Sequence, residues 1–255
     1  MRILYQFPLS LFCEKARWLL DHKELHYVAK NLTPGLHRLT TQHHTQSKHL
    51  PVLKDDKKWI ADSSKIADYL DCYYPEHALI RSEPELRERI LEIDALSQDF
   101  GIHVRRWLFY FILQFEHNSA IEVIIGERGW LRDLKALARP TIKFAINSYH
   151  HITGNTAVES KQKIDAMVEQ FNRILVDNGG QYMVADRLTL AEIAVCSMIA
   201  PLMMIEGTPW EREQHSEIAP EVMAFQHYLL QIPLGQYVQR IYEQERNARV
   251  DWRGI

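Results

Sequence analysis

The chain has 255 residues, of which 46% are hydrophobic and 25% are charged, and its formal net charge at pH 7 is −3. These fractions are those of an ordinary globular protein that is long enough to bury a core of its own. A net charge this small produces no field that would favour a nucleic acid or a membrane surface as partner, and we expect neither.

The N-terminal segment and the cysteines indicate a cytoplasmic protein. Residues 1–12 carry one early arginine but lack the apolar core and small residues of a signal peptide. The longest apolar stretch, Trp107 to Phe115, is far too short to cross a bilayer. The three cysteines follow no disulfide spacing, which favours a reducing compartment: Cys13, Cys72 and Cys196.

Strand and helix signals alternate from residue 3 to Pro75. Apolar runs, prolines and turn residues predict a β-α-β-loop-β-β-α order, with strands over 3–7 and 26–29, a polar loop over 33–49, a hairpin over 51–61 and helices from Ser10 and over 66–73. This order is typical of a compact α/β unit.

Beyond Pro75 only helical periodicity is visible. The polar, proline-containing segment 75–84 is typical of a linker, and helices are predicted from Leu86 into an aromatic stretch and over 131–151, 160–176 and 190–204. The last of these begins with a capping box, in which Thr189 caps the helix and Glu192 reaches back. We therefore predict an α/β domain over residues 1–77, a linker over 78–85 and an all-helical domain over 86–255.

Three separated motifs resemble those of the cytosolic glutathione transferases. Residues 7–17 (FPLSLFCEKAR) resemble the first strand and helix start of that family, 50–53 (LPVL) its segment with a cis-proline, and 62–66 (DSSKI) its Glu/Gln-Ser-x-Ala-Ile segment. The helix start at Thr189 is similar to the folding motif in the family's C-terminal domain. The resemblance implies a thioredoxin-like N-terminal domain, an all-α helical-bundle C-terminal domain and a homodimer.

The resemblance also implies that the chain binds glutathione as a co-substrate. A cis bond between Leu50 and Pro51 would turn the Leu50 N–H and C=O toward a peptide-like ligand. Ser63 would bind the γ-glutamyl carboxylate at a helix N-terminus, and Asp62 would pair with the ammonium of that residue. The alternatives are a trans proline that opens a strand and a plain N-cap at residue 62 or 63. Candidate cations for the glycyl carboxylate precede the proline: Lys48 and His49.

Ser10 is the candidate catalytic residue. Glutathione transfer needs a thiolate at neutral pH, whereas a free thiol has a pKa of about 8.5. A hydroxyl that donates a hydrogen bond to sulfur favours the charged form, and a helix N-terminus adds to this effect. Serine-type and cysteine-type family members keep their catalytic residue at this helix start, while the position of the catalytic tyrosine in other members is Gln6 here. The alternative is that Ser10 only caps the helix.

Three residues near Ser10 are interpreted as structural. Tyr5 points to the opposite face of its strand, so we assign it to the core. Cys13 lies on an apolar stripe and is interpreted as a buried, inert thiol, and Arg17 as a brace of the domain. Ser10 stands where a redox Cys-x-x-Cys motif has its nucleophilic cysteine, which argues against disulfide reductase chemistry.

The aromatic stretch supplies the candidates for the second-substrate site, although side chains at helical spacing also suit a core: Arg106, Trp107 and Tyr110. The histidines between 43 and 49 lack the companion ligands of a metal site, and we expect no metal. The sequence thus favours a glutathione S-transferase that activates the thiolate for attack on a small hydrophobic electrophile, as in detoxification. The alternatives are a non-catalytic ligand- or partner-binding protein of the same fold and, less favoured, a glutathione-dependent reductase or dehalogenase.

Overall fold

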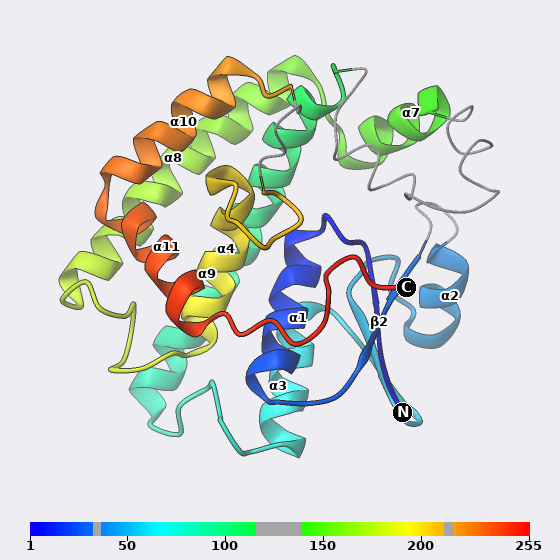
Figure 1. Cartoon of the computed structure of the whole chain (residues 1–255), viewed down its shortest axis with the longest axis vertical. Coiled ribbons are helices and arrows are strands. Elements are labelled where there is room, and N and C mark those ends of the chain that lie inside the picture. Colours follow the sequence, from blue (N-terminus) through cyan, green and yellow to red (C-terminus); the bar gives the residue numbers. More distant parts are fainter. Residues whose placement is uncertain (33–36, 116–138, 212–216) are drawn as a thin grey trace.

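The computed structural model describes residues 1–32, 37–115, 139–211 and 217–255. A small sheet with α2 lies on one side of the molecule and a larger group of helices on the other, with α1 between them (Figure 1). In the described ranges, no helix combines the length and the apolar character that a membrane crossing requires.

The N-terminal part is a four-stranded sheet in the order β2-β1-β3-β4. β1 pairs parallel with β2 and antiparallel with β3, and β3 pairs antiparallel with β4. Parallel neighbours need a long crossover, which α1 supplies. The elements in chain order are β1 (Arg2–Gln6), α1 (Leu11–His22), β2 (Val28–Asn31), α2 (His37–Thr45), β3 (Val52–Asp55), β4 (Lys58–Ala61) and α3 (Ser63–Tyr73).

The β3–β4 hairpin confirms the turn predicted at residues 54–57. Asp55 pairs with Lys58, and Asp56 in the turn has a φ of 51°. Aspartate tolerates this left-handed conformation better than most residues do. The hairpin ends at Ala61, directly before Asp62 and the start of α3.

The segment predicted as a polar loop, 33–49, contains a helix instead. α2 (His37–Thr45) buries only His37 and Thr41, so it carries no apolar stripe from which a helix could be predicted. Residues 33–36 of the same segment lie outside the described ranges. β2 also begins two residues later than the strand predicted over 26–29.

The C-terminal part is built of helices around α9. Its described helices are α4 (Pro84–Ile112), α7 (Arg139–His150), α8 (Gly154–Asp177), α9 (Leu190–Met203), α10 (Pro220–Gln231) and α11 (Pro233–Glu245). α9 is buried along its whole length and packs against α1, α4, α10 and α11. Thr189 and Glu192 form the predicted capping box, with the Thr189 N–H donating to Glu192 Oε2 at 2.6 Å.

The limits of the predicted helices differ in places, and α4 begins at Pro84, two residues before the predicted start. The helix expected over 131–151 is represented by α7, and its residues 131–138 lie outside the described ranges. α8 starts at Gly154 and not at 160, because Thr153 and Thr156 form a capping box there.

The two parts share one hydrophobic core. Within the described residues, a continuous cluster of buried apolar side chains runs from Leu4 of β1 through Trp18 of α1 to Val195 of α9. Gly101 of α4 allows the start of α1 to approach, since a Cβ at this position would lie 2.8 Å from Leu11 Cδ1. The start of α1 is therefore held against the middle of α4.

The segment after α11 returns to the sheet, as the red trace in Figure 1 shows. The Asn31 N–H donates to the Ile255 C=O at 2.8 Å, and the Ile255 N–H donates to the Ala29 C=O at 2.9 Å. The C-terminal residues thus occupy the hydrogen-bonding groups of β2 at the edge of the sheet.

Candidate functional site

The segment before β3 presents open backbone groups. The Leu50–Pro51 peptide bond is cis, as the resemblance implies, and the Pro51 C=O accepts a hydrogen bond from the Asp62 N–H at 3.2 Å. In the described part of the chain, the N–H and C=O of Leu50 have no hydrogen-bond partner. An extended peptide can bind to such free backbone groups.

Asp62 and Ser63 lie at the start of α3, beside this segment. Asp62 has φ 83° and ψ 132°, an unfavourable conformation for a residue with a Cβ, and such strain is concentrated at ligand sites. Its Oδ1 accepts from the Ser64 and Lys65 N–H groups at 2.9 and 3.2 Å, so the N-cap reading of Asp62 is confirmed. Ser63 is 1% exposed, and its hydroxyl has no partner among the described residues, which leaves a buried donor and acceptor unexplained by the protein alone.

A buried polar network holds the start of α3 in place. The Ser64 hydroxyl donates to Asp94 of α4 and accepts from Lys15 Nζ of α1 at 2.8 Å and from Gln98 Nε2 at 2.5 Å. Lys15 is fully buried and forms an ion pair with Asp94. The two serines therefore differ: Ser64 is engaged by three neighbours, whereas Ser63 next to it is not.

Ser10 caps α1. Its Oγ accepts from the Cys13 N–H at 3.4 Å, at the positive end of the helix dipole. Burial raises the pKa of the Cys13 thiol, and the Ser10 hydroxyl only partly offsets this effect. Cys13 is fully buried, which confirms its interpretation as a structural thiol. While its oxygen accepts this bond, the Ser10 hydroxyl can still rotate to donate its own hydrogen.

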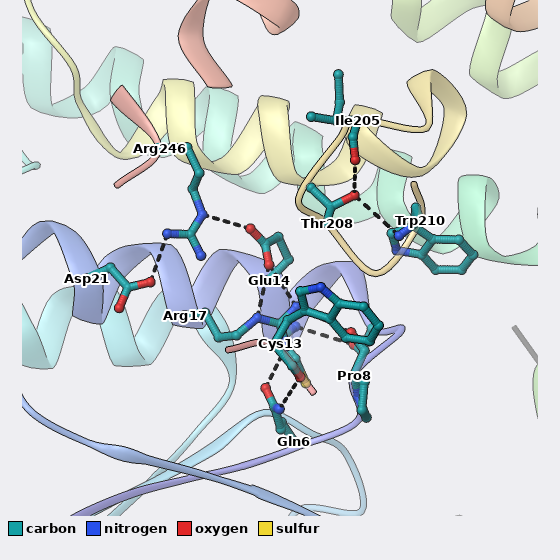
Figure 2. A network of polar contacts seen from close by, with 12 residues as sticks. Gln6, Pro8, Cys13, Glu14, Arg17, Asp21, Ile205, Thr208, Trp210 and Arg246 are labelled. Atoms are coloured by element: carbon teal, nitrogen blue, oxygen red, sulfur yellow. Dashed lines mark hydrogen bonds and ion pairs between the residues drawn. The ribbon is translucent and has the colours of Figure 1, made fainter. Parts of the chain in front are cut away.

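Gln6 is committed to the structure of the domain. It is fully buried, its Oε1 accepts from Arg17 Nη1 at 2.5 Å, and its Nε2 donates to the Trp252 C=O at 3.0 Å (Figure 2). Arg17 also bonds Glu14 Oε2 at 2.7 Å, which confirms that it braces the domain. Tyr5, 8% exposed and stacked on Trp59, belongs to the core as predicted.

The histidines before β3 pack against aromatic rings. His44 stacks on Trp59 with 3.9 Å between ring centroids, and His43 meets His44 edge-on. In the ranges that the structure describes, no three His, Cys, Asp or Glu side chains are grouped as a metal site would require.

A cavity of about 240 Å³ lies between the segment before β3, α4 and α7. Basic and aromatic side chains from these three elements line it: Lys48, His49, Arg105, Arg106, Tyr149 and His150. The Arg105 guanidinium lies over the Phe12 ring, 5.7 Å from its centroid. Phe12 belongs to the first turn of α1, so Arg105 is the cavity residue that contacts this helix.

The expected second-substrate residues are separated by the structure. Arg106 lines the cavity, where its Nε donates to the His150 C=O at 3.2 Å. Trp107 is 4% exposed and packs between Phe111 and Phe225 in the helical core. Tyr110 also packs against the core and does not line the cavity. A helix turns by about 100° per residue, so position 107 faces away from the side that carries 102 and 106, whereas position 110 lies one turn beyond 106 on that side.

Two protein-family models match the chain. The model described as glutathione S-transferase, N-terminal domain, matches residues 4–78, and the one described as glutathione S-transferase, C-terminal domain, matches residues 143–233. Together they cover more than half of the chain, in the expected order. The chain belongs to the glutathione S-transferase family.

Solved structures of glutathione transferases have the same fold. One from Rhodospirillum rubrum has 18% identity and a TM-score of 0.58 over 98% of this chain and 96% of that chain. One from Methylobacterium radiotolerans, in complex with glutathione sulfonate, has 18% identity and a TM-score of 0.56 over 93% and 94%. One from Phanerochaete chrysosporium has 17% identity and a TM-score of 0.62 over 94% and 95%. At these identities the likeness shows the fold alone, and no curated protein sequence matches the chain.

The charge in the cavity of this glutathione transferase family member is carried by arginines. Burial lowers the pKa of Arg105 to about 10, so its guanidinium stays protonated at neutral pH. Burial, and then the charge of Arg105, lowers the pKa of His150 to about 3 and also lowers that of His49. Both imidazoles are therefore neutral where the arginines are charged.

Sequence reasoning selected Arg106 for the site but not Arg105, Tyr149 or His150. A signal for Arg105 was present, because it stands with Arg106 inside a strongly apolar helical stretch. No sequence signal placed Tyr149 near His49, yet the Tyr149 hydroxyl and His49 Nδ1 are 2.9 Å apart.

Proposed function

We propose that the protein is a glutathione S-transferase that binds glutathione along Leu50 and stabilises its thiolate with Ser10. The observation that supports this most is the unpaired backbone of Leu50, which offers one free donor and one free acceptor to a peptide-like ligand. Glutathione is a short peptide with a thiol in its middle residue, so backbone pairing at Leu50 would fix the position of the sulfur.

The start of α3 would take the γ-glutamyl end. The cap hydrogen bonds of Asp62 both end on Oδ1, which leaves Oδ2 to accept from the ligand ammonium. The helix N-terminus at Ser63 favours a carboxylate. Lys48 and His49 are exposed and directly precede Leu50, where they would bind the glycyl carboxylate.

The reaction would follow from a stabilised thiolate. The Ser10 hydroxyl would donate to the sulfur, and the thiol proton would pass to solvent. The sulfur would form a bond to an electrophilic carbon, whose leaving group departs with the bonding electron pair. In this proposal residues 1–77 bind glutathione, residues 86–255 supply the second-substrate site, and 78–85 connect them. A homodimer and a cytoplasmic location also remain predictions.

Turnover of a chlorodinitrobenzene by wild type and by Ser10→Ala tests the proposal. We expect Ser10→Ala to lower kcat/KM roughly 100-fold, the usual effect of removing one donor to a developing or stabilised anion. Ser82→Ala is the control, since Ser82 is exposed and its hydroxyl donates to the neighbouring Glu83. Equal activity of Ser10→Ala and wild type would show that Ser10 only caps α1.

A second candidate is a non-catalytic glutathione-binding protein of the same fold. The observation in its favour is that the Ser10 oxygen is already engaged as the cap of α1. Saturable glutathione binding without turnover of any electrophile would favour this candidate over the enzyme.

A further inference from the structure

We propose that the cavity beside α4 binds an acidic second substrate, and that Arg105 is the main contact for its carboxylate. This inference rests on the proposed function and narrows it from a hydrophobic electrophile to one that carries an anionic group. Three observations support it: the charges around the cavity, the buried and unpaired Nε of Arg105, and the size of the cavity.

The cavity wall is positively charged. Lys48, Arg105 and Arg106 line it from two separate elements, and none of its described lining residues is a carboxylate. Arg38 of α2 adds a further charge behind this wall, with its guanidinium 4.5 Å from the centroid of the Tyr149 ring. The negative charge of Asp62 interacts with His49, but Asp62 does not line the cavity, and its Oδ1 already accepts hydrogen bonds from the first N–H groups of α3. Like charges gathered without a counter-charge favour an anionic ligand.

Arg105 differs from its neighbour in what it contacts. Arg106 bonds the His150 C=O through Nε and Ser160 Oγ through Nη1. The Nε of Arg105 is buried and has no hydrogen-bond partner in the described part of the chain, and the contact of its guanidinium there is the face of the Phe12 ring. A buried charge without a partner is unfavourable, and a carboxylate would relieve this by accepting a pair of parallel N–H bonds.

The size and position of the cavity suit a small acid. Its volume of about 240 Å³ lies just below the ~300–1,000 Å³ of sites for drug-sized ligands. Ile102 supplies an apolar wall, and the Arg105 guanidinium lies 5.7 Å from the centroid of the Phe12 ring in α1. A carboxylate on Arg105 would therefore hold the remainder of an aromatic acid between the segment before β3, α4 and α7, the three elements that line the cavity.

Binding of two unreactive probes tests the contact without any turnover. Calorimetric titration would compare 4-nitrobenzoate with neutral 4-nitrobenzyl alcohol on wild type, Arg105→Gln and Arg89→Gln. Arg89 is the control because it lies on the same helix, is half exposed and forms a surface ion pair with Glu92. We expect wild type and Arg89→Gln to prefer the acid at least tenfold, and Arg105→Gln to lose that preference.

A second comparison uses the reaction. The ratio of kcat/KM for 4-chloro-3-nitrobenzoate to that for 1-chloro-2,4-dinitrobenzene should fall about tenfold in Arg105→Gln. Should Arg105→Gln fail to fold by circular dichroism, Arg105→Lys, which keeps the charge but loses the paired donors, should show a partial loss of the same preference.

The outcomes separate the two proposals. Acid binding that depends on Arg105 in a protein without turnover supports this inference and contradicts the transferase proposal. Turnover of both electrophiles with an unchanged ratio in Arg105→Gln overturns the inference and leaves the transferase proposal intact. A third result also overturns the inference: Arg105→Gln binds glutathione more weakly than wild type does but still prefers 4-nitrobenzoate. The cavity would then hold the glycyl carboxylate of glutathione.

Discussion

Arg246, in the segment after the last helix, forms an ion pair with Glu14 in the first helix, with Nε 2.9 Å from Oε1. Its Nη1 lies 2.8 Å from Oδ2 of Asp21, and the other oxygen of Glu14 holds Arg17 (Figure 2). All four side chains are buried. The C-terminal segment thereby fixes α1, the helix at whose start Ser10 lies.

Loss of this contact should destabilise the protein strongly. We expect Arg246→Met to lower the free energy of unfolding by about 3–5 kcal/mol, because Glu14 and Asp21 lose a buried partner. Arg249→Met is the control, since Arg249 lies 3.9 Å from an exposed Glu24 and should change stability by less than about 1 kcal/mol. Urea unfolding measures both, and equal effects of the two substitutions would contradict the importance of the buried pair.

The same ion pair predicts an acid dependence of stability. Burial would raise the pKa of Glu14, but Arg246 and then Arg17 hold it at about 2, below its ordinary 4.5. A lowered folded-state pKa contributes stability that is present above the unfolded pKa and is lost as the pH falls toward the folded value. The contribution of Glu14, on the order of 3 kcal/mol, should therefore disappear between about pH 5 and pH 2.

Urea midpoints of wild type and Glu14→Gln across this range test the prediction. Burial raises the pKa of Asp21, which acts in the opposite direction, and the charge of Glu14 adds to this rise, so Glu14→Gln also weakens the opposing contribution of Asp21. The two curves should converge as the pH falls. A constant difference between pH 6 and pH 2 would contradict the assignment.

The close approach of α1 to α4 can be tested at Gly101. A Cβ in Gly101→Ala would lie 2.5 Å from Met198 Sδ and 2.8 Å from Leu11 Cδ1. Overpacking of this kind costs about 1–3 kcal/mol, and the helix propensity of alanine returns about 1 kcal/mol of that. We expect a net loss of stability of about 1 kcal/mol by thermal unfolding, together with reduced turnover because Ser10 is displaced.

Gly154→Ala is the matched control for this substitution. Its Cβ would meet only the Tyr110 hydroxyl, at an ordinary 3.6 Å. This variant should be as stable as wild type or slightly more stable. Equal destabilisation by the two substitutions would show that the contact of Gly101 with α1 is not tight.

Local sequence signals were sufficient for much of the fold. The hairpin at 54–57, the capped α9 and the cis-proline segment each have a pattern within a few residues, and the structure confirms them. α2 could not be predicted because only His37 and Thr41 of it are buried. The pairing of Ile255 with β2 could not be predicted either, because nothing near the C-terminus specifies a partner in residues 29–31.

The residues of the candidate site could be predicted only where a short sequence motif contains them. Asp62 and Leu50 belong to short motifs, so their positions followed from the resemblance. The cavity depends on how three distant segments pack, and its most distinctive group, the unpaired Arg105, has the same residue type as the hydrogen-bonded Arg106 beside it. The role of Gln6 could not be predicted for the same reason, since its hydrogen bonds to Arg17 and Trp252 depend on tertiary contacts.

The most direct test of the account is calorimetric titration with glutathione of wild type, Asp62→Asn and Asp186→Asn. Asparagine keeps the cap of α3 and tolerates the positive φ of residue 62, but it removes the charge that would pair with the ligand ammonium. Asp186 is the control, since it is exposed and lies 3.5 Å from Arg81, remote in sequence from the site. We predict saturable binding to wild type and Asp186→Asn and roughly tenfold weaker binding to Asp62→Asn, whereas no binding to folded wild type would contradict the central claim.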